Sequence, residues 1–152
     1  MISPEVLRRY SYFAGADDEI LSELAVHSQE QNFSPGQYLF KEGEPAEKIY
    51  IIIKGEVAIS LQLGDGSIQE VDVMVAGDIV GWSALLQPSN YKAHAIANRQ
   101  TQAIALDAKR LIGFCRENHE FGYQIMCELI RSLGHRLSHA WIQLAAAHEA
   151  GE

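Results

Sequence analysis

Residues 77–95, GDIVGWSALLQPSNYKAHA, contain the residue types from which a phosphate-binding corner is built. Gly77 and Gly81 permit tight turns, small residues follow as a short helical start, and one lysine, Lys92, comes after them. The start of a helix offers unpaired backbone N–H groups to an anion. A nucleotide site usually also holds a carboxylate for the sugar, and none follows Asp78 here. The stretch therefore predicts a nucleotide site, an altered nucleotide site, or a corner that only closes a barrel.

Other groups of reactive side chains are sparse. A metal-binding jelly roll needs several histidines and a carboxylate inside the barrel, whereas the expected barrel contains only His94. His135 and His139 are spaced to share one helix face. We interpret them as a solvated or interhelical pair rather than as metal ligands. Ser83 has no neighbouring base and is interpreted as a helix cap. We therefore expect no catalytic residue, no metal ion and no cofactor.

Composition limits the possible partners. The chain has 152 residues and fits one domain, residues 1–152. A formal net charge of −8 argues against direct binding to nucleic acid or to an anionic membrane. The longest apolar run, Ile49–Ile53, is too short to span a membrane, and the N-terminus lacks an apolar signal core. These features predict a cytoplasmic protein in which Cys115 and Cys127 are reduced, buried thiols.

The elements that must position the 77–95 stretch are helices at both ends and strands between them. Residues 4–30 predict two short helices, with Pro4 in the first turn and Asp17 and Asp18 capping the second. Glycine turns and period-two alternation over residues 33–106 predict an antiparallel jelly-roll barrel, and thus an α+β, mainly β, fold. Strands are expected at Tyr38–Phe40, Ile49–Ile53, Val57–Leu63, Val71–Val75, Lys92–Ala97 and Gln102–Leu106.

Helices return over residues 107–147. Asp107 is suited to cap one helix, and a second, proline-free helix follows Asn118 to about Ala147. Apolar residues along the second helix recur at heptad spacing, which favours the seam of a parallel dimer. An intramolecular core stripe would give a similar pattern near the start of the helix. The seam residues are Met126, Ile130, Leu133, Leu137, Ala140 and Leu144.

Residues 34–59, SPGQYLFKEGEPAEKIYIIIKGEVAI, resemble the first half of cyclic nucleotide-binding domains. Such domains are the effector modules of catabolite activator-type regulators and of cyclic-nucleotide-dependent kinases and channels. The resemblance extends into the helix after the barrel and so covers nearly the whole chain. The matching residues are Pro35-Gly36, Glu42-Gly43, Gly55, Gly77-Asp78 and Gly81.

The resemblance implies a ligand, cAMP or cGMP, held inside the jelly roll against a phosphate-binding cassette. Here that cassette corresponds to residues 81–95, and Lys92 would neutralise the phosphate. Ligand binding would reposition the helix from Asp107 onward. The residues implied around the ligand are Gly81, Trp82, Ser83, Ala84, Leu85, Lys92 and Ala93.

Three positions of the cassette depart from the family pattern. Trp82 stands where a glutamate binds the ribose hydroxyl, Lys92 replaces the phosphate-binding arginine, and Ala93 replaces a hydroxyl side chain. Losing the carboxylate and the two-pronged guanidinium is expected to cost about 3 kcal/mol, or roughly a hundredfold in affinity. The Trp82 indole would either fill the space of the sugar or stack on a base.

Two functions follow as hypotheses. In the first, the domain is a stand-alone sensor of a cyclic nucleotide or similar small anion. In the second, the barrel is a degenerate scaffold, and the heptad seam serves dimerisation or binding to another protein. Because the sequence ends at Glu152, shortly after the long helix, no helix-turn-helix is expected. Either a regulatory partner is a protein rather than DNA, or the sequence is a piece of a longer protein.

Overall fold

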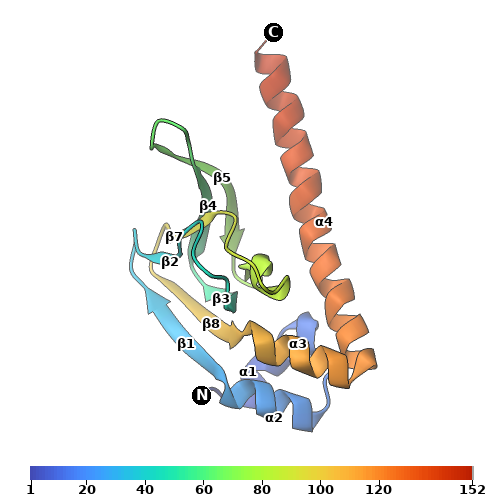
Figure 1. Ribbon diagram of the computed structural model, residues 1–152. Coiled ribbons are helices and arrows are strands. Elements are labelled where there is room, and N and C mark those ends of the chain that lie inside the picture. Colours follow the sequence, from blue (N-terminus) through green and yellow to red (C-terminus); the bar gives the residue numbers. More distant parts are fainter. Residues whose placement is uncertain (152) are drawn as a thin grey trace.

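The computed structural model describes residues 1–151, in which a β-sandwich stands beside helices from both ends of the chain (Figure 1). Two antiparallel four-stranded sheets have the orders β1-β8-β3-β6 and β2-β7-β4-β5, as the predicted jelly roll requires. The strands are β1 (Ser28–Phe33), β2 (Tyr38–Phe40), β3 (Lys48–Lys54), β4 (Glu56–Gln62), β5 (Ile68–Val75), β6 (Ile79–Val80), β7 (His94–Ala97) and β8 (Thr101–Asp107).

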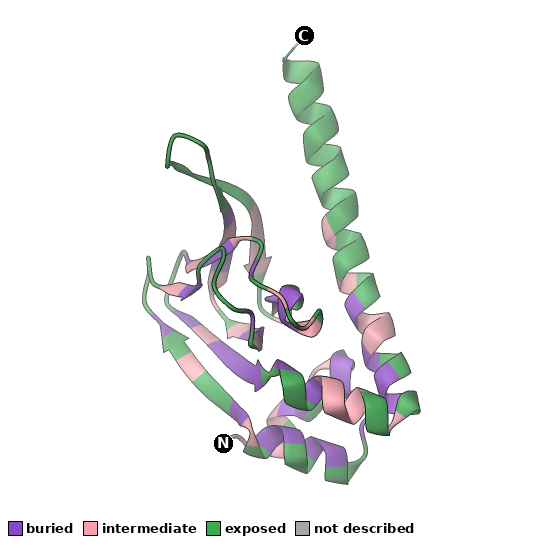
Figure 2. Cartoon of the chain, viewed as in Figure 1, coloured by how far each residue is buried: buried purple, intermediate pink, exposed green. Residues whose placement is uncertain are grey.

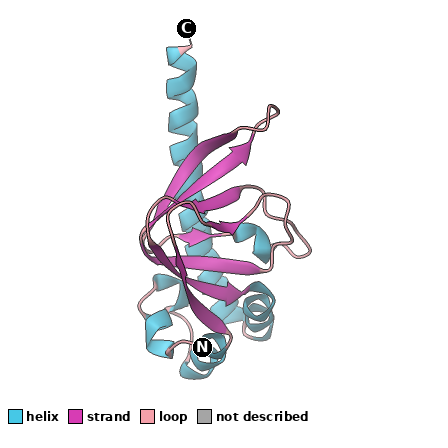
Figure 3. Cartoon of the chain, turned by 90° about the vertical axis from the view of Figure 1, so that its left-hand side faces the viewer, coloured by secondary structure: helices cyan, strands magenta, loops and turns pink. Residues whose placement is uncertain are grey.

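Helices gather at the end of the sandwich where the N-terminus lies (Figure 3). The predicted caps form: the side chain of Asp17 accepts from the backbone of Ile20, and that of Asp107 accepts from the backbone of Arg110. The helices are α1 (Pro4–Arg8), η1 (Ser11–Phe13), α2 (Asp18–Val26), η2 (Trp82–Leu85), α3 (Ala108–Glu117) and α4 (His119–Ala150), the η elements being 3-10 helices.

Two expected boundaries near residue 30 were wrong. The second helix ends at Val26 rather than near residue 30, because the Ser28 hydroxyl bonds back to the Leu24 carbonyl and residues 28–33 pair with β8. The barrel therefore begins at Ser28 instead of residue 33. At the other end, α4 continues to Ala150, a few residues beyond the expected Ala147.

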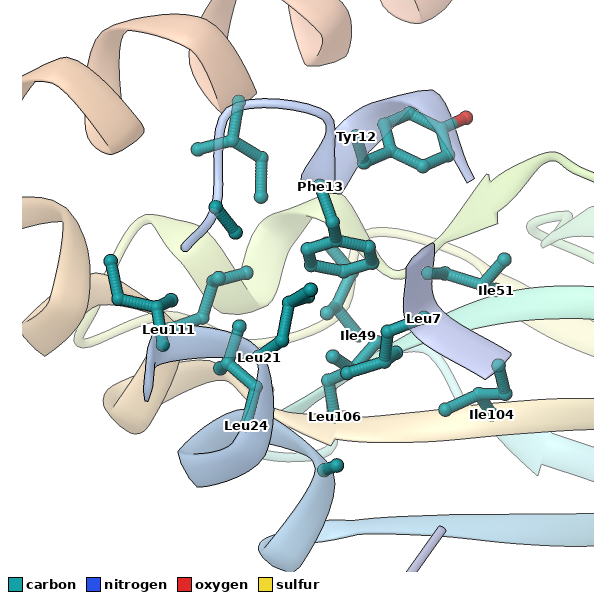
Figure 4. Packing of buried hydrophobic residues seen from close by; sticks show 14 of the residues in the cluster. Leu7, Tyr12, Phe13, Leu21, Leu24, Ile49, Ile51, Ile104, Leu106 and Leu111 are labelled. Atoms are coloured by element: carbon teal, nitrogen blue, oxygen red, sulfur yellow. The ribbon is translucent and has the colours of Figure 1, made fainter. Parts of the chain in front are cut away.

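The hydrophobic core has two parts that share the β3–β8 sheet. One lies between this sheet and the helices, where α1, η1 and α2 press Leu7, Phe13 and Leu21 against Ile49 and Leu106 (Figure 4). The other fills the sandwich with aromatic and small side chains. Its members are Phe33, Leu39, Phe40, Ala46, Tyr50, Ile52, Val57, Val80, Ala84, Tyr91, Ala95, Ala97, Ala103, Ala105 and Ala108.

The sandwich core makes stability sensitive to high pH. Burial, followed by repulsion from the Tyr91 phenolate that forms at high pH and from the Glu44 carboxylate, raises the pKa of Tyr50 from 10.0 to about 12. A raised pKa means that the folded state resists deprotonation of Tyr50. The stability that the protonated side chain contributes is therefore fully present below pH 10 and is lost as the pH rises to about 12. We expect melting temperatures to fall across this window and Tyr50→Phe to lessen the fall. Thermal melts of Tyr50→Phe and of the control Tyr38→Phe, which changes a tyrosine on β2 outside the seam, measure this; equal slopes in the two variants would contradict it.

The distal half of α4 stands apart from the rest of the molecule. Every residue from Leu137 to Ala150 is exposed, whereas Phe121, Ile125 and Leu129 nearer the start are buried (Figure 2). No helix within residues 1–151 has both the length and the apolar character needed to cross a bilayer. The intramolecular pattern therefore accounts only for the first turns of the helix, and the seam beyond them is uncovered.

Candidate ligand site

The corner between β6 and η2 is built around Gly81. Its φ of 92° lies in the left-handed region that favours glycine. A β-carbon there would lie 3.1 Å from the Lys48 carbonyl oxygen and 3.3 Å from both the Phe40 and Tyr91 rings. Space and backbone conformation thus both require glycine, which agrees with the tight barrel corner predicted from the sequence.

The short helix after Gly81 is well packed. Ser83 and Ala84 are buried, and the Ala84 amide donates to the Gly81 carbonyl at 3.1 Å. The capping residue is therefore Gly81, and the interpretation of Ser83 as a cap was wrong: its carbonyl instead accepts from the Leu86 amide at 3.0 Å. The reason is the left-handed turn at Gly81, which starts the 3-10 helix at Trp82. Leu85 is half-buried against the helical core.

Trp82 does not fill the barrel. Its side chain is 41% exposed, so the indole lies at the surface of the corner. The interior beside Gly81 is instead occupied by the rings of Phe40 and Tyr91, which stack with centroids 3.7 Å apart and planes at 9°. The Tyr91 hydroxyl donates to the Lys48 carbonyl at 2.7 Å, and burial raises the pKa of Tyr91.

Lys92 lies on the outside of the corner. It is exposed and lines an open hollow of about 680 Å³ together with Lys109, Glu47 and Asp107, and residues 81–85 do not line this hollow. Among residues 1–151, the Lys92 ammonium makes no hydrogen bond or ion pair. The next residue, Ala93, is half-buried. The structure thus joins residues 81–85 into one corner and leaves the lysine free at its outer side.

A carboxylate that sequence reasoning missed faces the interior on β5. Asp72 is opposite Ile59, which in turn is opposite the buried Ala95. Residues directly opposite each other in an antiparallel ladder share a face. Asp72 and Met74 therefore point inward, while Val71 and Val75 are exposed. The signal in the sequence was Asp72 itself, the single acidic residue within the apolar stretch of residues 71–75.

Arg136 ties α4 to this strand. Its NH1 group donates to the Asp72 carboxylate and to the Val73 carbonyl, both at 3.2 Å. The side chains of Arg136 and Asp72 are 34% and 18% exposed, so this pair is less screened than a fully exposed one. Arg136 is therefore not a solvated surface charge, because the helix passes close to the unpaired edge of β5. Arg131, by contrast, pairs with Glu128 on the same helix, as a surface charge would.

A smaller hollow, of about 310 Å³, separates α4 from the turn before β6. Arg131, Arg136, Asp78 and Glu128 line it, so charges of both signs face each other. Glu128 is already bound by Arg131 and by the Ser11 hydroxyl. This hollow offers no excess of one charge and is a weaker candidate for an anionic ligand than the Gly81 corner.

Comparison with known proteins points to one family. The family model described as the cyclic nucleotide-binding domain matches residues 30–118. The chain is 28% identical, over 129 residues, to a CRP-like cAMP-activated global transcriptional regulator of Mycobacterium tuberculosis. This match covers 85% of the chain but 58% of the regulator, so the chain spans less than two thirds of that protein's length.

Solved structures share the fold. A protein from Geobacter metallireducens described as cyclic nucleotide-binding has a TM-score of 0.78 and 31% identity, and the match covers 90% of this chain and 99% of that one. A regulatory subunit of a cAMP-independent protein kinase A from Trypanosoma brucei, in a triple mutant bound to cAMP, has a TM-score of 0.67 and 25% identity. That match covers 84% of this chain and 44% of the other.

Proposed function

Because the chain belongs to the cyclic nucleotide-binding domain family, we propose that it is a cytoplasmic regulatory sensor of a cyclic nucleotide or similar small anion. One observation supports this proposal: at the corner that the family resemblance assigns to the ligand, Gly81 has the left-handed conformation and the Trp82 indole is exposed beside it. The backbone of residues 81–85 would face the phosphate, and Ala93 would lie beside it. Trp82 would stack on the base.

Lys92 supplies the positive charge in this proposal. Its ammonium has no partner within residues 1–151, and its long, flexible stem can turn toward a phosphate at the corner. An ammonium acts as a point charge and lacks the fork geometry of arginine. We therefore expect weaker and less selective binding than in a domain with the full family pattern.

The signal would pass to α4 by two routes. Ala84 of η2 packs in the same cluster as Ala108 of α3, so movement of the corner would move α3 and the helix that follows it. The second route is the bond from Arg136 to Asp72 and Val73, which couples α4 directly to the barrel. A ligand that binds one arrangement of these contacts better than another shifts the position of α4.

The output would be a homodimer formed through α4. The seam residues beyond the first turns are exposed in the single chain, with Leu133 at 40%, Leu137 at 50% and Leu144 at 70%. Tyr123, which is 73% exposed, continues the same spacing toward the start of the helix. A parallel two-stranded coil would cover this stripe, and the dimer would present α4 to a further protein partner.

The alternative, a scaffold that has lost its ligand, is favoured by one observation. Phe40 and Tyr91 stack directly beside Gly81, and their rings fill part of the interior. In that case the barrel would only support the α4 dimer.

Calorimetric titration separates the two functions. We expect measurable heat and a thermal shift with cAMP or cGMP, and roughly a hundredfold tighter binding in the combined variant Trp82→Glu, Lys92→Arg, Ala93→Ser, which restores the family contacts. Lys109→Arg, in the same hollow as Lys92, is the matched control and should change nothing. No heat and no thermal shift at millimolar ligand in the unmodified chain would reject the sensor and leave the scaffold.

A further inference from the structure

Two side chains mark the face of α4 that points toward its own barrel. Leu129 is 4% exposed within the helical core, and Arg136 donates to β5. They are seven residues apart and so occupy the same heptad position. The seam residues occupy positions a and d of the heptad, with Ile130 and Leu137 at a. Leu129 and Arg136 then both occupy position g. The g flank of the seam therefore faces the barrel of the same subunit.

Trp141 lies on the other flank of the seam, at position e. Its side chain is 61% exposed, and its own barrel cannot cover it because the g flank faces that barrel. It belongs to the stretch from Leu137 to Ala150, in which every residue is exposed and which extends about 21 Å at the rise of an α-helix. A single helical segment of this length is marginal in water without a packing partner.

A second copy of the chain fits this uncovered flank. The seam repeats at heptad spacing, which favours a parallel pair of identical helices. In such a pair, each g residue lies beside the e residue of the next heptad in the partner, so Leu129 would face Gly134 and Arg136 would face Trp141. Neither pairing sets like charges against each other. The residues at g are Leu129, Arg136 and Gln143, and the e residues that face them are Gly134, Trp141 and His148.

We propose that Trp141 of each subunit packs over the partner subunit's Arg136 and covers the Arg136–Asp72 junction, so that each barrel is completed by a residue from the other copy. This inference rests on the proposed parallel dimer and adds a specific contact to it. A guanidinium stacks favourably on an indole face. Covering the junction also removes water, which strengthens the ion pair that ties α4 to β5. Dimerisation and the position of α4 on the barrel are thereby coupled.

Tryptophan fluorescence tests the contact. In a Trp82→Phe background, Trp141 is the remaining tryptophan. We expect its emission to be blue-shifted in the dimer, and to move toward that of a solvated indole when Arg136→Met removes the guanidinium. Sedimentation should show that Trp141→Ala weakens self-association about tenfold, whereas Trp141→Phe retains most of the affinity. Ile142→Ala is the matched control, because Ile142 is 67% exposed and falls at position f, away from the seam.

The outcomes separate the contact from the dimer itself. If the chain is dimeric but Trp141 emits as a solvated indole, and Trp141→Ala associates as tightly as Ile142→Ala, the contact is overturned while the dimer stands. A chain that stays monomeric at all concentrations overturns both. All of the substituted residues on α4 other than Arg136 are exposed in the single chain, so loss of folding does not explain a change, and circular dichroism of each variant verifies this.

Discussion

Replacing Leu133 and Leu137 together with glutamate is expected to reduce the particle in solution to a single chain of 16.9 kDa. These side chains are 40% and 50% exposed in the single chain, so the substitutions hardly affect its core. In a parallel dimer they meet their own copies across the seam, and glutamates would set like charges against each other there. Light scattering measures the mass directly.

The matched control places the same charges elsewhere on the same helix. Ser138→Glu with Ala145→Glu adds two carboxylates at exposed positions outside the seam and should leave the dimer intact. An unchanged mass in the seam variant would contradict the dimer. A monomer in both variants would show that added charge, rather than the seam, governs association.

Gly55→Ala is expected to lower the free energy of unfolding by about 3–5 kcal/mol, from left-handed backbone strain together with overpacking. Gly55 forms the turn between β3 and β4 with a φ of +110°. A β-carbon there would lie 2.7 Å from the Gln100 carbonyl oxygen and 2.7 Å from the Thr101 α-carbon. Backbone atoms cannot move aside as a flexible side chain can. The Thr101 hydroxyl, which accepts from the Glu56 amide at 3.2 Å, would be displaced as well.

Urea denaturation of Gly55→Ala beside Gly43→Ala separates the two causes. Gly43 also has a positive φ, +90°, but nothing lies within 4 Å of its β-carbon position. Its substitution should cost only the backbone strain, about 1 kcal/mol. Similar small losses in both variants would show that the β3–β4 turn relaxes and that the close approach does not limit it.

Much of the fold could be predicted because the signals are local. Asp17 and Asp107 cap helices through bonds to backbone amides three residues away. The glycines that have a positive φ mark turns, because glycine adopts that conformation without a steric penalty. The exception among the elements was residues 28–30, which read as helix but pair with β8, a partner more than seventy residues away. Local helix propensity is overridden where a distant strand supplies the backbone hydrogen-bond partners.

The candidate site was harder to predict, because its parts meet across the fold. Tyr91 follows no motif, yet it stacks on Phe40 beside Gly81. Asp72 and Arg136 are 64 residues apart and meet only because α4 passes the edge of β5. Which way Lys92 points depends on the path of the chain around the outer hollow.

The amino-acid sequence by itself determined the jelly roll, its glycine corners and the heptad stripe of α4, since each depends on spacing and on conformations available to one residue at a time. Only the tertiary structure decided which carboxylate faces the barrel interior, which cation joins the helix to the sheet, and which flank of the stripe remains open. Those choices are made by contacts between distant segments, whose energies exist only after the chain has folded.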